Sequence, residues 1–448
     1  MKTILLLGAG MSASSLIRYL LQHAEQFNWQ LRVVDQSLDL VNRKINGHPR
    51  GVALSFNALD RTERWEELKG ADLVISMLPA RFHVEVAKDC LELKKHLITP
   101  SYVAPEMKAL DQEVKAAGLL FMNEIGVDPG IDHMSAMQII DEIRAKGGTI
   151  TSFKSYCGGL IAPESDNNPW NYKFTWNPRN VVLAGQGIAA QYIDHDQYKY
   201  LPYGQLFARL DHIDVEGYGS FDGYANRDSL SYRAVYGLET IPTLYRGTLR
   251  RKGYCQAWNV FVQLGMTDDS YALANAENLT ARTFLNAFLR FDETKTVEEK
   301  FTIFCAQFGV TDIERFRWID LFDGETVIGF ENATPAQLLE KILVKKWVLE
   351  PGDKDMLVMV HEFVYELHGT RHEIISSMVN IGEDPTYTSM SNTVGLPVGI
   401  CAKLMLTGAL KDTGVHVPIA AHVYQPILTE LQGMGITFNE KHRTLGSC

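Results

Sequence analysis

The segment that most constrains the fold is a glycine turn near the N-terminus. It lies between an apolar segment at residues 3–7 and an amphipathic segment that begins near Leu16. Its sequence, GAGMSA, matches the G-x-G-x-x-A pattern of dinucleotide-binding turns, in which Gly8 permits the turn, Gly10 lets the backbone approach a pyrophosphate, and Ala13 allows close helix packing. An ordinary glycine turn can show the same pattern. The strand-like and helix-like flanks favour a nucleotide site, because a helix N-terminus offers N–H groups to phosphates.

A second strand-like segment, residues 31–35, ends in Asp35, which lies 22 residues beyond Ala13. At this position a dinucleotide fold places the carboxylate that accepts hydrogen bonds from the ribose hydroxyls of adenosine. A carboxylate here repels a 2′-phosphate, and the nearest basic residues, Arg43 and Lys44, fall on the next predicted helix. The residues therefore favour NAD(H) over NADP(H). An exposed acid at a strand end is the alternative interpretation of Asp35.

Strand-like and helix-like segments continue to alternate up to about residue 122. The predicted strands cover residues 52–56, 73–78, 96–99 and 119–122, and helix-like segments at 84–95 and 105–117 separate them. This alternation predicts a parallel, doubly wound sheet, in which ligands bind at the carboxyl ends of the strands. The candidate residues at those ends are Asn57, Ala58, Ser76, Met77, Leu78, Pro79, Ser101, Tyr102 and Asp128. We expect the adenine near Asn57 and the nicotinamide beside the later loops.

The loop at residues 123–133 combines acids, glycines and a proline. Asp128 followed by Pro129 predicts a helix N-cap with proline in the first helical position, and the apolar spacing that follows extends the helix to about Arg144. His133 is then a polar residue of the first turn. Because this turn lies at the carboxyl edge of the predicted sheet, Asp128 is also placed to bind a substrate ammonium group. The two roles are compatible.

After residue 148 the regular alternation stops. Residues 149–156 predict a strand, 157–164 a tight loop, and 168–180 an irregular segment of polar, aromatic and basic residues. Long irregular segments in compact domains are commonly binding loops. Arg227 and Arg246, in later glycine-rich segments, carry the planar fork that suits carboxylates. A surface position is the alternative for each arginine.

The rest of the chain completes a plan of several domains. Residues 267–352 are predicted to be helical, strands return at 355–360 and 373–379, and apolar helices at 398–406 and 425–433 are expected to pack back on the first domain. The predicted fold is α/β. It has a Rossmann dinucleotide-binding domain (1–130 with about 392–448), an inserted mixed α/β domain for substrate binding and dimerisation (about 131–266 with 353–391) and a small helical domain (about 267–352).

Composition excludes several classes of function. The formal net charge of −11 argues against a nucleic acid or an anionic membrane as partner. The six cysteines show no C-x-x-C pair and no metal-ligand spacing, so we expect reduced thiols and no metal site. The sequence shows no signal-peptide pattern and no apolar run of membrane-spanning length. These features predict a cytoplasmic protein.

Several long motifs resemble the glutamate-forming saccharopine dehydrogenases, also called saccharopine reductases. The matching stretches run along nearly the whole chain and are LLLGAGMSA, VISMLPARFH, NEIGVDPGIDHM, SFKSYCGGLIAPE, NPWNYKFTW, NRDS, YRGTLRRKGY, DKDMLVMVHEF and TSMSNTVGLPVGICAKLML. The resemblance implies an oxidoreductase of lysine metabolism and amino-acid biosynthesis. In its reaction, glutamate and 2-aminoadipate 6-semialdehyde condense to an imine, which a nicotinamide cofactor reduces reversibly to saccharopine. We also expect a homodimer.

The resemblance supports a set of ligand contacts. With the glycine turn, the expected cofactor contacts are Gly8, Gly10, Met11, Ser12, Ala13, Asp35, Asn57, Ala58, Ser76, Met77, Leu78, Pro79 and Ser101. The expected substrate contacts are Ser101, Tyr102, Asp128, Arg227 and the loop of Arg246, Gly247, Thr248 and Leu249, and we add Cys157. For proton transfer, Asp128, Tyr102, Lys173 and Cys157 are candidates, of which we favour Asp128 and Tyr102. Cys157 is otherwise a packed residue of its loop.

One departure from the family bears on the cofactor. Fungal members have a Cys-Arg-Thr-like sequence after the second strand, suited to a 2′-phosphate, where this chain has Val34, Asp35 and Gln36. The departure supports NAD(H), and NADP(H) remains possible from the family. The alternatives are a carboxynorspermidine synthase-like condensation with a polyamine and a non-catalytic dinucleotide sensor. A polyamine site calls for more acids and fewer arginines, and a sensor would lose the polar loops at the nicotinamide end.

Overall fold

The computed structural model describes residues 1–447 of the chain, so Cys448, the sixth cysteine, lies outside the described residues. The chain divides into two compact units. The first unit comprises Met1–Ile150 and residues 365–447, and the second comprises Thr151–Val364. Each unit is described by itself below. The three-domain division drawn from the sequence stays a prediction.

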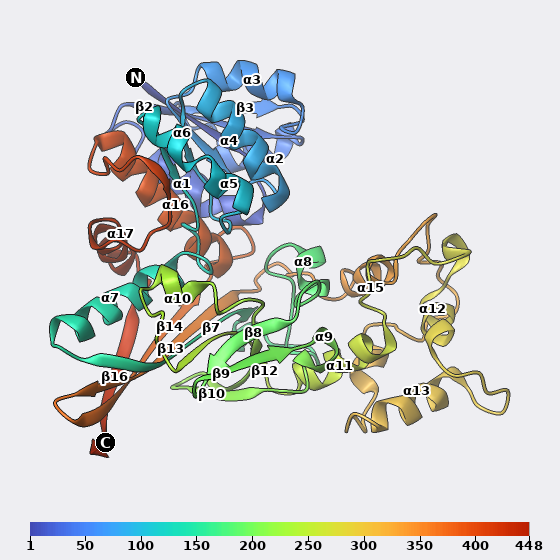
Figure 1. Cartoon of the computed structure of the whole chain (residues 1–448). Helices are drawn as coiled ribbons and strands as arrows, with labels where there is room; N and C mark the ends of the chain where they lie inside the picture. The colour runs from blue at the N-terminus through green and yellow to red at the C-terminus, as the bar shows by residue number, and fades with distance from the viewer. Residues whose placement is uncertain (448) are drawn as a thin grey trace. The chain divides into compact units, whose positions relative to one another are not determined.

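The first unit contains a seven-stranded parallel sheet in the order β15-β6-β5-β4-β1-β2-β3 (Figure 1). Its strands are β1 (Lys2–Leu7), β2 (Trp29–Asp35), β3 (Gly51–Ser55), β4 (Leu73–Ser76), β5 (His96–Ile98), β6 (Leu120–Met122) and β15 (Gly414–His416). The central strands β1 and β4 are apolar and buried, which is typical of a parallel sheet covered on both faces. The predicted Rossmann-type α/β fold is confirmed, and β15 is an additional strand that the sequence pattern did not reveal.

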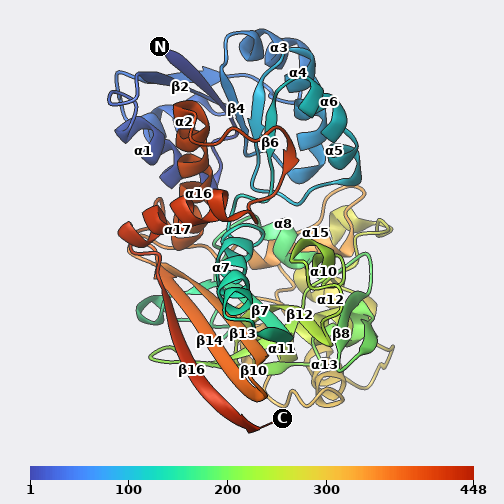
Figure 2. The same cartoon turned by 60° about the vertical axis from the view of Figure 1, so that its left-hand side comes forward.

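Helices cover both faces of this sheet. The helices of the first unit are α1 (Ser14–Gln22), α2 (Leu38–Ile45), α3 (Arg61–Lys69), α4 (His83–Glu92), α5 (Pro105–Ala109), α6 (Asp111–Ala116), α7 (Ile131–Ala145), α16 (Ser389–Thr407) and α17 (Ala421–Gly433), with 3-10 turns η1 (Met11–Ala13) and η2 (Ala80–Phe82). Apolar residues of α3 to α6, among them Leu68, Val86 and Met107, share one core with β1, β4 and β5. Figure 2 shows these four helices on one side of the sheet and α1, α2 and α16 on the other.

Helix α16 packs against α1, as expected for a segment that returns to the first domain. The prediction of its start was wrong, because α16 begins at Ser389 and runs through Pro397, whereas we expected a helix from residue 398. Thr388 caps this earlier start by accepting the Ser391 N–H at 2.9 Å. A proline in the middle of a helix removes one backbone hydrogen bond, and here the buried packing of the surrounding turns outweighs that loss.

The first unit also contains an antiparallel pair of long strands, β14 (Thr370–Ile381) and β16 (Phe438–Ser447). Figure 2 shows them side by side as the orange and red arrows near the C-terminus. We predicted a strand at 373–379 within β14, whereas β16 was not predicted. The sequence of β16, FNEKHRTLGS, is mostly polar and alternates only weakly between apolar and polar residues. Its own pattern therefore does not predict a strand, and its pairing with β14 stabilises the extended conformation.

The second unit is built on a mixed sheet in the order β10-β11-β12-β7-β13, with β8 paired to β12 and β9 paired to β8. Its strands are β7 (Thr149–Ile161), β8 (Ala190–Asp194), β9 (Gln197–Leu201), β10 (Asp211–Val215), β11 (Gly219–Ala225), β12 (Thr243–Arg251) and β13 (Asp355–Leu367). Its helices are α8 (Pro178–Val182), α9 (Tyr203–Leu206), α10 (Tyr232–Val235), α11 (Tyr254–Leu264), α12 (Ala281–Phe288), α13 (Val297–Ala306), α14 (Glu314–Trp318) and α15 (Pro335–Leu343), with turns η3 (Pro163–Ser165) and η4 (Ala276–Asn278). Helices α12 to α15 fill the stretch predicted to be helical, and Thr334 caps α15.

A predicted loop of the second unit is part of a strand. β7 continues through Cys157, Gly158 and Gly159 to Ile161, so the tight loop predicted at 157–164 was wrong. Gly158 allows a close approach between strands, because a Cβ there would lie 2.6 Å from the Leu249 carbonyl oxygen of β12.

Among residues 1–447, no helix has the length and apolarity needed to cross a membrane. The five described cysteines are buried, and none forms a disulfide bond with another described cysteine.

Candidate cofactor and substrate site

The glycine turn joins β1 to η1 and α1 in a conformation that requires glycine. Gly8 has a φ of +98°, and a Cβ there would lie 3.0 Å from the Met77 carbonyl oxygen, so the turn packs directly against the end of β4. A Cβ at Gly10 would meet no atom within 4 Å. The space in front of Gly10 and the exposed backbone therefore fit a dinucleotide pyrophosphate at the start of α1.

Asp35, at the end of β2, holds the glycine turn. Its Oδ2 accepts the Ala9 N–H at 2.9 Å, and its Oδ1 accepts the Ser37 N–H at 3.2 Å. Each carboxylate oxygen can accept a further hydrogen bond, so the carboxylate can also bind ribose hydroxyls. Asp35 is thus both a structural part of the turn and a candidate ribose ligand.

Lys44 lies at the same turn, although the sequence placed it only on the following helix. Its Nζ donates to the Gly10 carbonyl oxygen at 2.5 Å. Burial lowers the pKa of Lys44 to about 8, and the nearby Asp35 carboxylate opposes that shift. A cation therefore lies beside the acid that was expected to exclude a 2′-phosphate. Lys44 and Gly10 are 34 residues apart in the chain, so the sequence alone does not show this contact.

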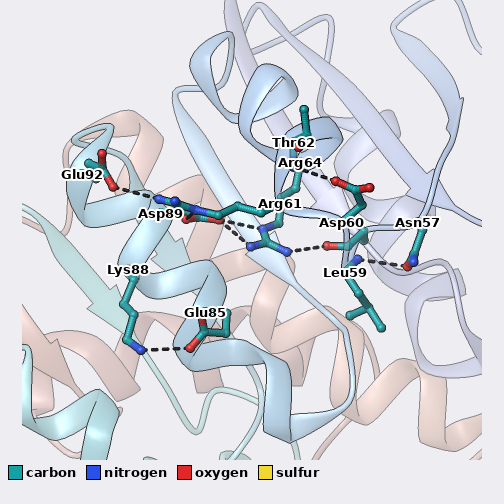
Figure 3. A network of polar contacts seen from close by, with 11 residues as sticks. Asn57, Leu59, Asp60, Arg61, Thr62, Arg64, Glu85, Lys88, Asp89 and Glu92 are labelled. Atoms are coloured by element: carbon teal, nitrogen blue, oxygen red, sulfur yellow. Dashed lines mark hydrogen bonds and ion pairs between the residues drawn. The ribbon is translucent and has the colours of Figure 1, made fainter.

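A buried ion pair supports the predicted adenine loop at Asn57 and Ala58 (Figure 3). Arg64, on α3, donates from Nη1 to the Ala58 carbonyl oxygen at 2.8 Å and from Nε and Nη2 to Asp89 Oδ2 at 2.9 and 2.6 Å. Arg64 and Asp89 are 4% and 2% exposed. Asn57 Oδ1 accepts the Leu59 N–H at 3.1 Å, which shapes the turn itself. The loop is thereby fixed from below by α3 and α4.

Three polar side chains meet where β4 and β5 end. Ser76 is the last residue of β4, Ser101 follows β5, and His83 is the first residue of α4. His83 Nδ1 lies 2.9 Å from Ser76 Oγ, and its Nε2 lies 2.8 Å from Ser101 Oγ. His83 is 3% exposed, and burial lowers its pKa to about 4. No role for this histidine follows from its local sequence, although it ends the VISMLPARFH motif.

Tyr102 and Asp128, the two residues favoured for proton transfer, meet in the first unit. The Tyr102 hydroxyl donates to Asp128 Oδ1 at 3.1 Å, and Tyr102 is 44% exposed. The predicted N-cap role of Asp128 was wrong, because α7 begins at Ile131 with Gly130 as its N-cap, and the Asp128–Pro129 peptide is cis. Asp128 therefore lies in the loop before the helix, with its carboxylate directed to Tyr102.

Glu124 ties this loop to the one that carries Tyr102. Its Oε1 accepts the Val103 N–H at 2.9 Å, and its Oε2 lies 2.7 Å from His133 Nε2. Glu124 is 6% exposed, and His133, which lies in the first turn of α7 as predicted, is fully buried. The polar contacts below Tyr102 hold its backbone in place.

In the second unit, the predicted substrate residues gather on three neighbouring segments. Arg246, Gly247, Thr248 and Leu249 lie within strand β12, so the loop expected there was wrong. β12 pairs with β7, where Thr248 faces Cys157, and with β11. The Asn226 N–H donates to the Arg246 carbonyl oxygen at 2.8 Å, which places the turn of Arg227 beside β12. Gly247 has no side chain, and the Tyr156 ring packs in the space this leaves within β12, 2.7 Å from the position that a Cβ would take.

The two arginines differ in exposure. Arg246 is 4% exposed, and its guanidinium lies 4.2 Å from the centre of the Tyr232 ring. Arg227 is exposed. Arg250 is buried and surrounded by the rings of Tyr172, Tyr224 and Tyr254. Because Arg250 is buried, its guanidinium does not lie on the surface where that of Arg227 is exposed.

Lys173, a further candidate for proton transfer, forms a buried ion pair. Its Nζ lies 2.6 Å from Asp353 Oδ2, and Asp353 also accepts the Glu350 N–H at 2.7 Å. Lys173 is 3% exposed. The pair joins the irregular segment after β7 to the segment before β13, which is a structural task. Among residues 1–447, no group of three or more His, Cys, Asp or Glu could hold a metal ion.

The predicted site residues thus fall into two sets. The glycine turn, Asp35, the Asn57 loop, Ser76 to Pro79, Ser101, Tyr102 and Asp128 follow the carboxyl edge of the parallel sheet in the first unit. Cys157, Arg227 and the residues of β12 belong to the second unit. The ligand contacts assigned to both sets stay predictions.

Two family models match the chain. "Saccharopine dehydrogenase NADP binding domain" matches residues 4–122, and "Saccharopine dehydrogenase C-terminal domain" matches residues 126–436. Together these models cover most of both units. The first model covers the strands and loops that carry the predicted cofactor contacts.

Curated relatives and a solved structure agree with the family models. "Saccharopine dehydrogenase [NADP(+), L-glutamate-forming]" of Saccharomyces cerevisiae is 33% identical over 98% of this chain and 99% of its own length. "Alpha-aminoadipic semialdehyde synthase, mitochondrial" of Mus musculus is also 33% identical, and this chain spans only 47% of its length. The structure of apo histidine-tagged saccharopine dehydrogenase (L-Glu forming) from Saccharomyces cerevisiae has a TM-score of 0.87 at 31% identity, covering 99% of this chain and 100% of that one. The chain therefore belongs to the saccharopine dehydrogenase family.

Proposed function

We propose that the chain is an oxidoreductase that interconverts saccharopine with L-glutamate and 2-aminoadipate 6-semialdehyde. The observation that carries this proposal is the similarity to the yeast enzyme over nearly the whole length of both chains. The Tyr102–Asp128 pair at the carboxyl edge of the sheet supports it, because the reaction needs proton transfers beside a bound dinucleotide. A nicotinamide cofactor, when bound, supplies or accepts the hydride.

The residues of the chain have two tasks in this proposal. Those of the first unit bind the dinucleotide, with the pyrophosphate at Gly10 and the adenosine ribose at Asp35. The exposed Arg227 is the proposed ligand of a substrate carboxylate, since saccharopine carries three carboxylates and a guanidinium binds a carboxylate with two parallel hydrogen bonds. Arg246 is buried and stays a predicted substrate contact. Such positioning accounts for most of the rate of a hydride transfer.

Asp128 is the proposed proton acceptor. In the direction of glutamate formation, water adds to the carbon of the substrate imine, and the water proton passes to the Asp128 carboxylate. The proton returns from Asp128 to the carbinolamine nitrogen, the C–N bond breaks as the C=O bond of the semialdehyde forms, and the hydroxyl proton passes to the Asp128 carboxylate as glutamate leaves. The Tyr102 hydroxyl, which donates to Asp128 at 3.1 Å, holds the carboxylate in position for both transfers.

Asp35 gives the proposed preference for NAD(H), because its carboxylate lies where a 2′-phosphate would be repelled. NADP(H) is a second candidate that a specific observation favours, since Lys44 lies at the turn beside Asp35 and offers a positive charge to a phosphate. The names of the fungal relatives specify NADP(+).

The test follows the absorbance of reduced nicotinamide after saccharopine is added to the protein with NAD or with NADP. We expect reduction with at least one cofactor, and formation of glutamate in equal amount. Asp128→Asn keeps the shape of the side chain and should lower kcat by roughly 100-fold, the usual size of a lost acid–base contribution. Tyr200→Phe, at a tyrosine that is 62% exposed, is the matched control. Binding of both cofactors without any reduction would refute the proposed activity.

A further inference from the structure

His83 forms a continuous hydrogen-bonded chain with two serines, and all three belong to the first unit. Ser76 is fully buried at the inner end of this chain, whereas Ser101 is only partly buried at the outer end. Of the three residues, Ser101 is the most exposed, so its hydroxyl is the one that a ligand at the carboxyl edge could reach. His83 has not been placed among the ligand contacts.

The imidazole of His83 is neutral at ordinary pH. Burial lowers its pKa to about 4, and its place at the first residue of α4 also disfavours a cation, since a helix N-terminus carries partial positive charge. A neutral imidazole has one N–H donor and one nitrogen acceptor. Each serine hydroxyl has a single proton to donate.

These facts couple the directions of the two hydroxyls. If Nε2 carries the proton, it donates to Ser101 Oγ, and Ser101 keeps its own proton for a ligand. Nδ1 then accepts from Ser76. If Nδ1 carries the proton, Ser101 must donate to Nε2 and presents only lone pairs. The tautomer of His83 thus decides whether Ser101 meets the ligand as a donor or as an acceptor.

We propose that His83 is a positioning residue that holds Ser101 as a hydrogen-bond donor to a carboxylate of the amino-acid substrate. A carboxylate only accepts hydrogen bonds, so its binding at Ser101 selects the Nε2–H tautomer. Ser76 completes the chain by donating to Nδ1. The inference rests on the proposed function, because it takes the ligand at Ser101 to be an amino acid with carboxylates.

Two substitutions separate the ends of the chain. The amide of His83→Gln reaches roughly the place of Nε2 and retains a partner for Ser101, whereas the amide of His83→Asn reaches that of Nδ1 and retains only Ser76. We expect His83→Asn to raise both KM and the calorimetric Kd for saccharopine by roughly 10-fold, as for a lost hydrogen bond to a charged group, with a smaller change in kcat. The Gln variant should recover a clear part of that loss.

His422→Asn is the matched control, because His422 is an exposed histidine of the same unit, and it should change neither constant. Equal effects of the Asn and Gln variants, a larger effect of Gln, or no effect of either would overturn the positioning role. In a Ser101→Ala background, His83→Asn should cause no further rise in KM, since the hydroxyl that it orients is absent. A full additional rise would refute the proposal.

A measurement on the unaltered protein covers the case in which the variants fail to fold. In ¹⁵N-histidine NMR spectra near pH 6, His83 should show one protonated and one unprotonated ring nitrogen, and saccharopine should place the proton on Nε2. A doubly protonated ring, or a proton on Nδ1 in the complex, would contradict the proposal. A correct tautomer shift without any cofactor reduction would refute the proposed activity while leaving the role of His83 intact.

Discussion

At the scale of single residues, Asp35 has a structural role and an electrostatic role, and its substitution should affect the use of NAD and of NADP differently. Its carboxylate holds the glycine turn through the Ala9 N–H and is also the group expected to repel a 2′-phosphate. Removing the carboxylate should loosen the turn, which weakens the binding of both NAD and NADP. It should also remove the repulsion of the 2′-phosphate, which only NADP carries. The ratio of kcat/KM for NADP over that for NAD therefore reports the electrostatic role separately from the structural one.

For Asp35→Ala we expect lower kcat/KM with NAD and a ratio of kcat/KM for NADP over NAD that rises by about 10-fold, equivalent to ~1.4 kcal/mol. Lys44→Met in the same background should reverse most of that gain, because it removes the cation at the turn. Initial rates with each cofactor measure the ratio. Asp39→Ala, at an exposed acid of α2, should leave it unchanged. A ratio that stays constant in Asp35→Ala would show that this carboxylate does not select the cofactor.

The depressed pKa of His83 predicts a pH dependence of stability. In the unfolded chain the ring takes up a proton below about pH 6.5, whereas in the folded protein it does so only near pH 4. The unfolded state therefore binds more protons between these values, and stability falls as the pH is lowered from 6.5 to 4, by up to ~3 kcal/mol from this residue. Denaturant unfolding of the wild type and His83→Asn should show a shallower decline in the variant. Parallel declines would contradict this assignment.

At the scale of elements, the packing of α16 on α1 sets the position of the glycine turn. A Cβ at Gly395 would lie 2.9 Å from the Leu16 nitrogen and 3.1 Å from the Ser12 carbonyl oxygen, both backbone atoms. Ser15 reinforces this contact, because its N–H donates to Ser391 Oγ at 2.8 Å and its hydroxyl donates to Asn392 Oδ1 at 2.6 Å. A helix from the C-terminal part of the chain thus supports the phosphate-binding end of α1.

Gly395→Ala should destabilise the protein by about 1–3 kcal/mol, as expected for a side chain forced into a filled space. It should also weaken dinucleotide binding, because α1 has to move where the turn enters it. Thermal unfolding and cofactor titration measure the two effects. Gly433→Ala in α17, where a Cβ would meet no atom within 4 Å, is the matched control and should be neutral or slightly stabilising. Unchanged stability in Gly395→Ala would mean that the helices separate at no cost.

At the scale of the whole molecule, the proposed function distributes recognition over the two units. The expected dinucleotide contacts lie in the first unit, and Arg227 and Arg246 lie in the second. Substitution of an exposed arginine in the second unit should therefore change the use of the amino acid and spare the binding of the cofactor. The expected homodimer stays a prediction.

Arg227→Ala should raise KM for saccharopine by roughly 10-fold or more, as for the loss of a charge-assisted hydrogen bond, while the Kd for the dinucleotide changes by less than about twofold. Steady-state kinetics and cofactor titration give the two values. Arg209→Ala, an exposed arginine of the same unit, should affect neither. Equal loss of substrate and cofactor binding would indicate a folding defect instead of a carboxylate contact.

Much of the first unit could be predicted from local pattern. The glycine turn, the acid that ends β2 and the alternation of strands with helices each depend on residues close together in the chain, and the parallel sheet follows from them. Similar local signals marked the capped helix α15, and the net charge argued against a nucleic acid or an anionic membrane as partner. The sequence by itself therefore determined the class of fold, and it predicted the edge of the sheet at which a ligand would bind.

The tertiary structure alone decided the features that depend on residues far apart in the chain. Pro397 and Gly158 look like breaks in the sequence, yet α16 and β7 run through them, because packing against α1 and β12 outweighs the local preference. The contacts of Lys44 with the glycine turn and of His83 with two strand ends have no local pattern at all. A hydrogen bond needs two groups within about 3 Å, and only the folded chain brings such groups together.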